Sequence, residues 1–454
     1  MSFSLDLSDA VEAASRDRPG EFAHEGVDLV HAVERESFVR LVNDPSLVSA
    51  FDRGEGTVNV LDDYERSIVT RLVPDADARL SLTSRARAAA RPLYRAARSR
   101  RLTTPSVPKR EVWLSAHHPK FVRFAAPVIE RLGPDRVGVF ALADEVEAEA
   151  RARGLAVVRH TDGPRRGARG FRRPHLADLL VSLETTLRAA GGRAILTFEG
   201  NSPSDEIARL ASFSAGLVSV CLQHGWAAET NVGFRNLAHT AFAVWGEGFA
   251  ELLGTFNPGQ RFVVTGDPAL DPLAGLPRPE PGGVLFALQT VTPAISRRTM
   301  QTFVELVGDA ATAYPDRQMI VREHPAHPLA KHGLAVSDLP NVSTAHPSEV
   351  TLDAALGPAA VVASISSTTL LEGAAAGRAA LVFSGDGPAY VPDLDSLGVG
   401  LELRERTAAV KALGVLLDTT PEREQALASF RDRYFAGLRG DAAERVAALV
   451  DSLS

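Results

Sequence analysis

The feature that most constrains the fold is a regular alternation of short apolar runs with helix-like stretches, which begins at Glu111 and continues to about residue 405. Apolar strands joined by helices such as 175–190 and 205–213 form parallel sheets, because each crossover helix covers one face of the sheet. A proline- and glycine-rich segment, 272–283, divides the alternation into two units. The expected strands are 112–116, 137–142, 156–159, 194–198, 218–222, 241–245 and 262–265 in the first unit, and 284–287, 319–321, 342–344, 360–363 and 379–383 in the second.

Residues 1–105 lack this alternation and are expected to form an additional, mostly helical region with a short strand at 58–61. The segment 79–110 contains many arginines and no acidic residue. A basic helix at 85–101, kinked at Pro92, is expected there. Such a helix is either a solvated surface or a contact with an anionic membrane or acceptor.

Composition excludes several classes of function. The formal net charge of −7 over 454 residues argues against a general nucleic-acid binder, which needs excess positive charge. Cys221 is the single cysteine, so neither an internal disulfide nor a multi-cysteine zinc site can form. The N-terminal residues do not resemble a secretory signal, and no apolar run is a clean membrane span. We therefore expect a cytoplasmic protein, with the 79–110 segment as a candidate peripheral contact on the inner membrane face.

Two polar motifs follow strands of the second unit, where ligands of parallel sheets bind. The first is Arg322–Pro325, in which Arg322 and His324 could offer positive charge to an anion. The second is Ser366–Thr369, where hydroxyls and free backbone N–H groups before a helix suit a phosphate. The pair predicts a site for a phosphorylated, nucleotide-bearing ligand.

Glu372 lies in the helix that follows the hydroxyl motif, expected at 370–376. It could hold a ribose or sugar hydroxyl, or only favour the positive end of that helix. The expected phosphate ligands are Ser366, Ser367 and Thr368. These residues could instead cap the helix, but a cap needs only one hydroxyl.

The first unit carries three polar loops after strands, at His117 and His118, at Glu199-Gly200, and at Gln223-His224. In a parallel sheet these loops meet at one edge, where a carboxylate or imidazole could take a proton from an acceptor hydroxyl. A structural role for any one loop histidine remains an alternative. A metal site at His117 and His118 is disfavoured, because no suitably spaced carboxylate accompanies them.

Gly266 and Asp267 end the last strand of the first unit, before Asp271. Gly266 allows a close backbone approach at the point where the chain crosses to the second unit. Asp267 either caps the next turn or touches the ligand.

At these motifs the chain resembles the GT-B glycosyltransferases, over about residues 111–405. Within that class it is similar to bacterial sialyltransferases, polysialyltransferases, capsule Kdo transferases and CDP-glycerol glycerophosphotransferases. The matching residues are His324-Pro325, Ser366–Thr369 and, more loosely, Glu199-Gly200. The resemblance implies an α/β, GT-B-like fold of two Rossmann-type domains facing a cleft. The implied divisions are an acceptor domain at 110–275, a donor domain at 283–405 and C-terminal helices at 406–454.

The resemblance also implies roles for individual residues. His324, Ser366 and Ser367 would bind the donor nucleotide and its phosphate, with CMP-sugars as the favoured donors. The general base in the sialyltransferase-like group is the first acid of an acid-acid-Gly motif, but Phe198 occupies that position here. A histidine in a His-Gly context serves as base in capsule and teichoic-acid transferases, so His224 is the first candidate and Glu199 the second.

A rival resemblance is to the non-hydrolysing UDP-GlcNAc 2-epimerases, whose Thr-Gly-Asn…Asp segment is similar to Thr265-Gly266-Asp267 and Asp271. Their Asp-Ser-Gly-Gly motif is absent. A nucleotide-sugar-binding protein without catalysis is a third alternative.

The predicted activity is transfer of a sugar from a nucleotide-sugar to a glycan or cell-surface polysaccharide, without a metal or other cofactor. No Asp-x-Asp pair lies in a suitable loop, because 75–77 precedes the first unit and 393–395 is expected to lie beyond the last strand. Hydroxyls and cationic side chains would offset the charge of the leaving phosphate instead.

Overall fold

The computed structural model describes residues 11–16, 22–24, 26–42, 107–159, 173–199, 202–226, 232–289, 295–324, 338–385 and 390–453. The expected strand at 58–61, the basic helix at 85–101 and the motif residues Gly200 and Pro325 lie outside these ranges.

The first unit is a sheet of seven parallel strands in the order β5-β4-β3-β6-β7-β8-β9. The point where the strand order reverses, between β3 and β6, is where doubly wound sheets bind ligands. The strands are β3 (Val112–Ala116), β4 (Val137–Ala141), β5 (Ala156–Arg159), β6 (Ala194–Phe198), β7 (Val218–Leu222), β8 (Ala241–Val244) and β9 (Phe262–Val264). Its helices are α6 (Pro119–Leu132), α7 (Asp144–Ala152), α8 (Arg173–Ala190), α9 (Pro203–Ala215) and α10 (Glu247–Gly254), with 3-10 turns at Pro134–Arg136, Val232–Phe234 and Pro268–Leu273.

The second unit is a sheet of six parallel strands in the order β12-β11-β10-β13-β14-β15. Its reversal point lies between β10 and β13, so both units have the doubly wound arrangement. The strands are β10 (Gly283–Ala287), β11 (Met319–Arg322), β12 (Val342–Ala345), β13 (Ala359–Ser364), β14 (Ala379–Phe383) and β15 (Gly400–Leu403). The helices are α11 (Arg297–Ala313), α12 (Leu352–Leu356), α13 (Thr369–Ala375) and α14 (Arg406–Leu417).

The central strands form because their apolar residues are covered on both faces of the sheet. Every residue of β3, β4 and β6 is buried. Packing is tight around Trp113, since a Cβ added at Gly138 would lie 2.7 Å from the indole ring. The predicted α/β, GT-B-like fold with two Rossmann-type sheets is therefore confirmed.

One strand of the second sheet was not expected from the sequence. The strand β15 follows the Asp393–Asp395 segment, so the prediction that this segment lies beyond the last strand is wrong. The side chain of Asp393 instead accepts hydrogen bonds from the backbone N–H groups of Asp395 and Ser396, which closes a local turn before β15.

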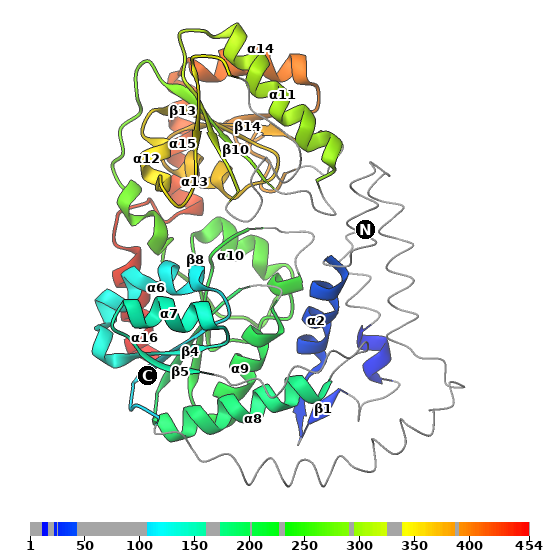
Figure 1. Cartoon of the computed structure of the whole chain (residues 1–454), viewed down its shortest axis with the longest axis vertical. Coiled ribbons are helices and arrows are strands. Elements are labelled where there is room, and N and C mark those ends of the chain that lie inside the picture. The colour runs from blue at the N-terminus through cyan, green and yellow to red at the C-terminus, as the bar shows by residue number, and fades with distance from the viewer. Residues whose placement is uncertain are drawn as a thin grey trace.

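The C-terminal helices tie the two units together (Figure 1). The helix α15 (Pro421–Tyr434) packs on α13 of the second unit and on α10 of the first. The helix α16 (Ala442–Leu453) returns to the first unit and packs against α6. Asp271 fixes this return, because its two carboxylate oxygens accept hydrogen bonds from the N–H groups of Ala442 and Ala443, each 3.0 Å long.

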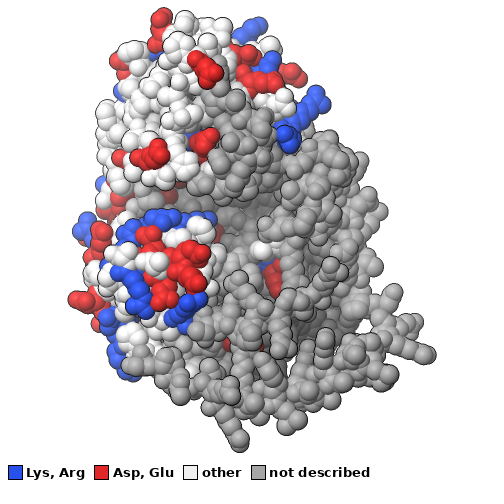
Figure 2. All heavy atoms as spheres, viewed as in Figure 1, with Lys and Arg blue, Asp and Glu red and all other residues white. Residues whose placement is uncertain are grey.

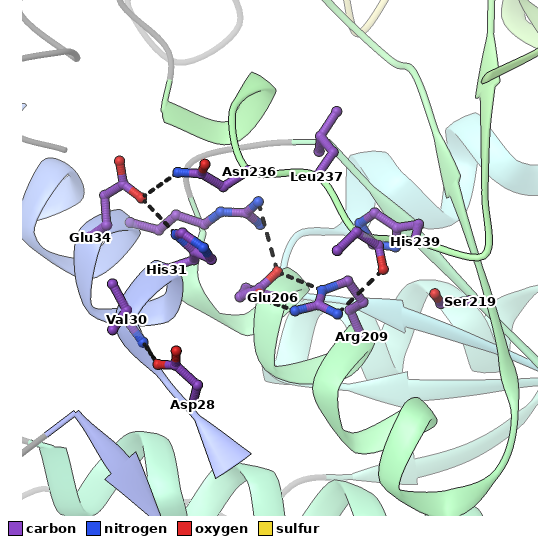
Figure 3. A network of polar contacts seen from close by, with 12 residues as sticks. Asp28, Val30, His31, Glu34, Glu206, Arg209, Ser219, Asn236, Leu237 and His239 are labelled. Atoms are coloured by element: carbon purple, nitrogen blue, oxygen red, sulfur yellow. Dashed lines mark hydrogen bonds and ion pairs between the residues drawn. The ribbon is translucent and has the colours of Figure 1, made fainter. Parts of the chain in front are cut away.

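The described N-terminal elements pack on the first unit. They include a short hairpin, β1 (Ala23–His24) and β2 (Val27–Asp28), and the helix α2 (Val30–Val42), which lies against α9. Figure 3 shows the polar network at this contact, where Glu206 of α9 binds Arg209 and Glu34 of α2 meets Asn236. Arg35 of α2 is 2% exposed and lies 3.9 Å from Glu206, so the contact buries charged groups.

Two surface properties bear on partners. No helix in the described ranges is both long enough and apolar enough to cross a bilayer. On the face shown in Figure 2, acidic and basic side chains of the described residues are interspersed. Residues 79–106, which hold most of the arginines of the 79–110 segment, lie outside the described ranges. The membrane contact of this segment therefore stays a prediction.

Candidate active site

A buried carboxylate and an imidazole meet at the carboxyl edge of the first sheet. Glu199 directly follows β6, and His224 lies two residues beyond the end of β7, the neighbouring strand. One carboxylate oxygen of Glu199 lies 2.7 Å from Nδ1 of His224, and the other accepts a hydrogen bond of 2.6 Å from the backbone N–H of His224. Glu199 therefore holds both the ring and the backbone of the same residue.

The surroundings of this pair are aromatic, with one cation nearby, because Nζ of Lys120 lies 4.8 Å from the centre of the Phe121 ring and its charge acts on Glu199. Phe121 and Phe198 are buried and stack with centroids 4.6 Å apart, and the Phe121 ring lies 4.8 Å from the His224 ring. Burial raises the pKa of Glu199, while the neighbouring His224 opposes that rise. Because Nδ1 faces the carboxylate, Nε2 on the opposite side of the ring is the atom left for proton transfer.

In the loop after β3, the consecutive residues His117 and His118 have different contacts. His118 is the N-cap of α6, and its Nδ1 accepts a hydrogen bond from the N–H of Lys120. The His117 ring instead packs on Phe121, with centroids 4.6 Å apart, and its Nδ1 lies 3.7 Å from Asp205. Asp205, at the start of α9, was not expected from the sequence.

Three other sequence candidates occupy structural positions in the first unit. Gln223 is buried, and its side-chain and backbone oxygens accept hydrogen bonds from the backbone and indole N–H groups of Trp245. Gly266 has φ +83° and lies against Ala442 of α16. Asp267 is buried and accepts a hydrogen bond from the N–H of Ala269, in agreement with its capping alternative.

The second unit brings its hydroxyl motif to the reversal point between β10 and β13. Ser366 is exposed, and its backbone N–H donates a 2.6 Å hydrogen bond to Gln289, which follows β10. Ser367 accepts a hydrogen bond from the N–H of Thr369, while Thr368 holds the N-cap position of α13 without a side-chain cap bond. The motif therefore offers hydroxyl groups beyond those that cap the helix, and Gln289 is a further polar residue of the same edge.

The two candidate edges are connected by hydrogen bonds between the units. Trp226, two residues after His224, donates from its indole N–H to the carbonyl of Val391. The neighbouring Tyr390 donates from its hydroxyl to the carbonyl of Ser367, at 3.1 Å. The imidazole edge of the first unit and the hydroxyl edge of the second thus belong to one continuous set of contacts.

Arg322 and His324 lie at the end of β11 and just beyond it. Arg322 is half-buried and donates a 2.7 Å hydrogen bond to the carbonyl of Val350, and burial lowers its pKa. His324 is partly buried. Glu372 of α13 lies close enough to Arg322 for the two charges to interact.

Substitution of Glu372 tests this charged neighbourhood. Burial raises the pKa of Glu372 to about 7, against opposing contributions from Thr369 and Arg322. The folded protein then binds more protons than the unfolded chain between the ordinary value of 4.5 and about 7, so the free energy of unfolding falls as pH rises through this window. We expect E372Q to remove roughly 2.5 kcal/mol of that fall between pH 5 and pH 8, since one pKa unit corresponds to ~1.4 kcal/mol and this range spans most of the window. Urea denaturation at pH 5 and pH 8 measures it.

The matched control for E372Q is E349Q, which changes an exposed glutamate of the same unit. An equal pH dependence of unfolding in E372Q and wild type would contradict the assignment.

The described residues contain no group of three or more His, Cys, Asp or Glu side chains placed to hold a metal ion. Metal independence is not decided by this observation and stays a prediction.

Comparison with solved structures supports the fold. A protein from Listeria monocytogenes assigned as UDP-N-acetylglucosamine 2-epimerase is 16% identical, with a TM-score of 0.55 over 76% of this chain and 96% of its own. UDP-GlcNAc 2-epimerase from Neisseria meningitidis, solved with UDP-GlcNAc, is 15% identical, with a TM-score of 0.54 over 76% of this chain and 100% of its own. The Methanocaldococcus jannaschii enzyme, solved with UDP-GlcNAc and UDP, is 12% identical, with a TM-score of 0.52 over 76% and 99%.

At these identities the likeness establishes a GT-B-like fold. No protein-family model matches the chain, and no curated protein matches it.

Proposed function

We propose that this protein is a glycosyltransferase that moves a sugar from a nucleotide-activated donor to a glycan or cell-surface polysaccharide. The observation that carries the proposal is the Glu199–His224 pair, whose loop is connected to the hydroxyl motif of the second unit by the Trp226–Val391 and Tyr390–Ser367 hydrogen bonds. A base on one edge and a phosphate-binding edge on the other are the two parts that sugar transfer needs.

In the proposed reaction, Nε2 of His224 takes the proton of an acceptor hydroxyl as that oxygen attacks the anomeric carbon. The bond from the anomeric carbon to the phosphate oxygen breaks, and its electron pair remains on the nucleotide. The hydroxyl groups of Ser366 and Ser367, with Arg322 and His324, are proposed to stabilise this charge. Glu199 stabilises the imidazolium that forms on His224.

The donor is proposed to be a nucleotide-sugar with a pyrimidine base. The family resemblance favours CMP-sugars, whereas the epimerases that share the fold bind UDP-GlcNAc or UDP. Thermal-shift measurements with CMP, CDP, UDP and GDP test the proposal and choose between these nucleotides. A melting temperature unchanged by all four would refute it.

A UDP-GlcNAc 2-epimerase is the second candidate, because two solved structures described as such enzymes share the fold with TM-scores of 0.55 and 0.54. Incubation with UDP-GlcNAc alone, followed by NMR, separates the two activities. An epimerase changes the configuration at C2 of the sugar, whereas a transferase requires an acceptor for sugar transfer and releases the nucleotide.

We expect the activity to survive EDTA. The proposed phosphate ligands are hydroxyl, guanidinium and imidazole groups, which offset negative charge without a metal. Product formation is measured before and after dialysis against EDTA, with buffer dialysis as the control. Complete loss of transfer that Mg²⁺ or Mn²⁺ restores would overturn the proposed stabilisation of the leaving group.

A further inference from the structure

The carboxylate of Asp205 is buried without an evident structural purpose. The residue is 1% exposed, and neither of its side-chain oxygens accepts a hydrogen bond from any described residue. The start of α9 is already capped, because Ser202 accepts a hydrogen bond from the N–H of Ser204. Burial of a carboxylate without hydrogen bonds lowers the stability of the fold, so we expect Asp205 to interact with another group.

The group that Asp205 faces is the ring of His117. Nδ1 of His117 lies 3.7 Å from the Asp205 carboxylate and is itself buried without a hydrogen bond to the described residues. The rest of the ring is accessible, since 32% of the His117 side chain is exposed. Asp205 therefore lies behind a partly exposed imidazole, and the charge of Lys120 is close enough to act on the same carboxylate.

The arrangement resembles the Glu199–His224 pair, and both imidazoles contact the same phenyl ring. Phe121 contacts both imidazoles, with centroid distances of 4.6 Å to His117 and 4.8 Å to His224. In both pairs Nδ1 faces a buried carboxylate, which leaves Nε2 directed away from it. Two imidazoles, each with Nδ1 towards a buried carboxylate, thus pack on one buried ring.

We propose that His117 is a second ligand-binding imidazole of this site, positioned by Asp205, and that the pair selects a polyhydroxylated acceptor. One acceptor hydroxyl binds His224 and loses its proton, while a neighbouring hydroxyl donates a hydrogen bond to Nε2 of His117. This inference rests on the proposed function and adds to it the residues that select the acceptor. A simple alcohol would satisfy His224 and leave His117 without a partner.

The test uses the full chain labelled with ¹⁵N-histidine, in which long-range ¹H–¹⁵N spectra report which ring nitrogen carries the proton. H117Q assigns the His117 signals. We expect neutral His117 to carry its proton on Nδ1 in the wild type and to shift towards the other tautomer in D205N. The matched control is D135N, which changes an exposed aspartate of the same unit. A His117 spectrum unchanged in D205N would remove Asp205 as the positioning residue.

Ligand selection is tested with two defined probes, methyl β-galactoside as a polyol and cyclohexanol as a simple alcohol. We expect the galactoside to perturb both the His117 and His224 signals and cyclohexanol to perturb only His224. H117Q should weaken galactoside binding about fivefold to tenfold, the effect of one hydrogen bond. Equal galactoside affinity in H117Q and wild type would overturn the acceptor role. These spectra need no turnover, so they decide this inference even if no nucleotide-sugar proves to be a substrate.

Discussion

Replacement of His224 by alanine is expected to lower the rate of sugar transfer by roughly 10²–10⁴-fold, the usual contribution of a general base. Nucleotide binding should change little, because the proposed donor site lies on the second unit. Steady-state kinetics, together with calorimetry for the nucleotide, measure these effects.

The partner substitution E199Q distinguishes the roles within the pair. Glu199 holds Nδ1 and the backbone of His224, so we expect E199Q to slow transfer less than H224A does. Near-normal turnover in H224A with abolished turnover in E199Q would reverse the two roles. Unchanged turnover in both would refute the pair as the catalytic centre.

Truncation of Glu206 to alanine is expected to cost about 3–5 kcal/mol of unfolding free energy, the effect of removing one partner of a buried ion pair. Glu206 is 1% exposed and binds Arg209 through two hydrogen bonds of 2.6 and 3.0 Å (Figure 3). Burial alone would raise the pKa of Glu206, but Arg209 and Arg35 lower it overall. The truncation leaves Arg35 buried without its ionic partner. Urea denaturation at neutral pH measures the loss.

The control for E206A is E184A, which removes a Glu–Arg pair of α8 whose arginine is 56% exposed. An exposed pair contributes about 0–1 kcal/mol, so this variant should unfold almost as the wild type does. Because the pKa of Glu206 is lowered by folding, the deficit of E206A should shrink as pH falls below the ordinary value of 4.5. Equal stability of E206A and E184A would contradict the network.

The two sheets could be predicted because strands that are buried on both faces appear in the sequence as continuous apolar runs. The strand β15 has no such run, since Glu402 alternates with leucines at the edge of the sheet. Asp205 and Glu206 could not be singled out from the sequence either, because acidic residues are common in the first turn of any helix. Only the tertiary structure shows that one faces His117 and the other faces Arg35 and Arg209.

The candidate site could be predicted in position more readily than in detail. The rule that polar residues follow parallel strands predicted that Glu199 and His224 share one edge of the sheet, and the two side chains do meet there. The same rule does not distinguish ligand-binding residues from structural ones. Gln223, which binds Trp245, and His118, which caps a helix, both follow strands and have structural roles. Gln289 followed a predicted strand as well, but an isolated glutamine carries no motif.

The return of α16 to the first unit has a consequence for synthesis of the chain. Its apolar residues, including Val446, Leu449 and Val450, belong to the same buried cluster as β3 and α6. During translation the first unit therefore emerges with part of its core uncovered, and the gap closes only after the entire second unit has been made. We expect the nascent first unit to expose an apolar groove along α6 until then, and so to depend on chaperones or on rapid completion of the chain to avoid aggregation.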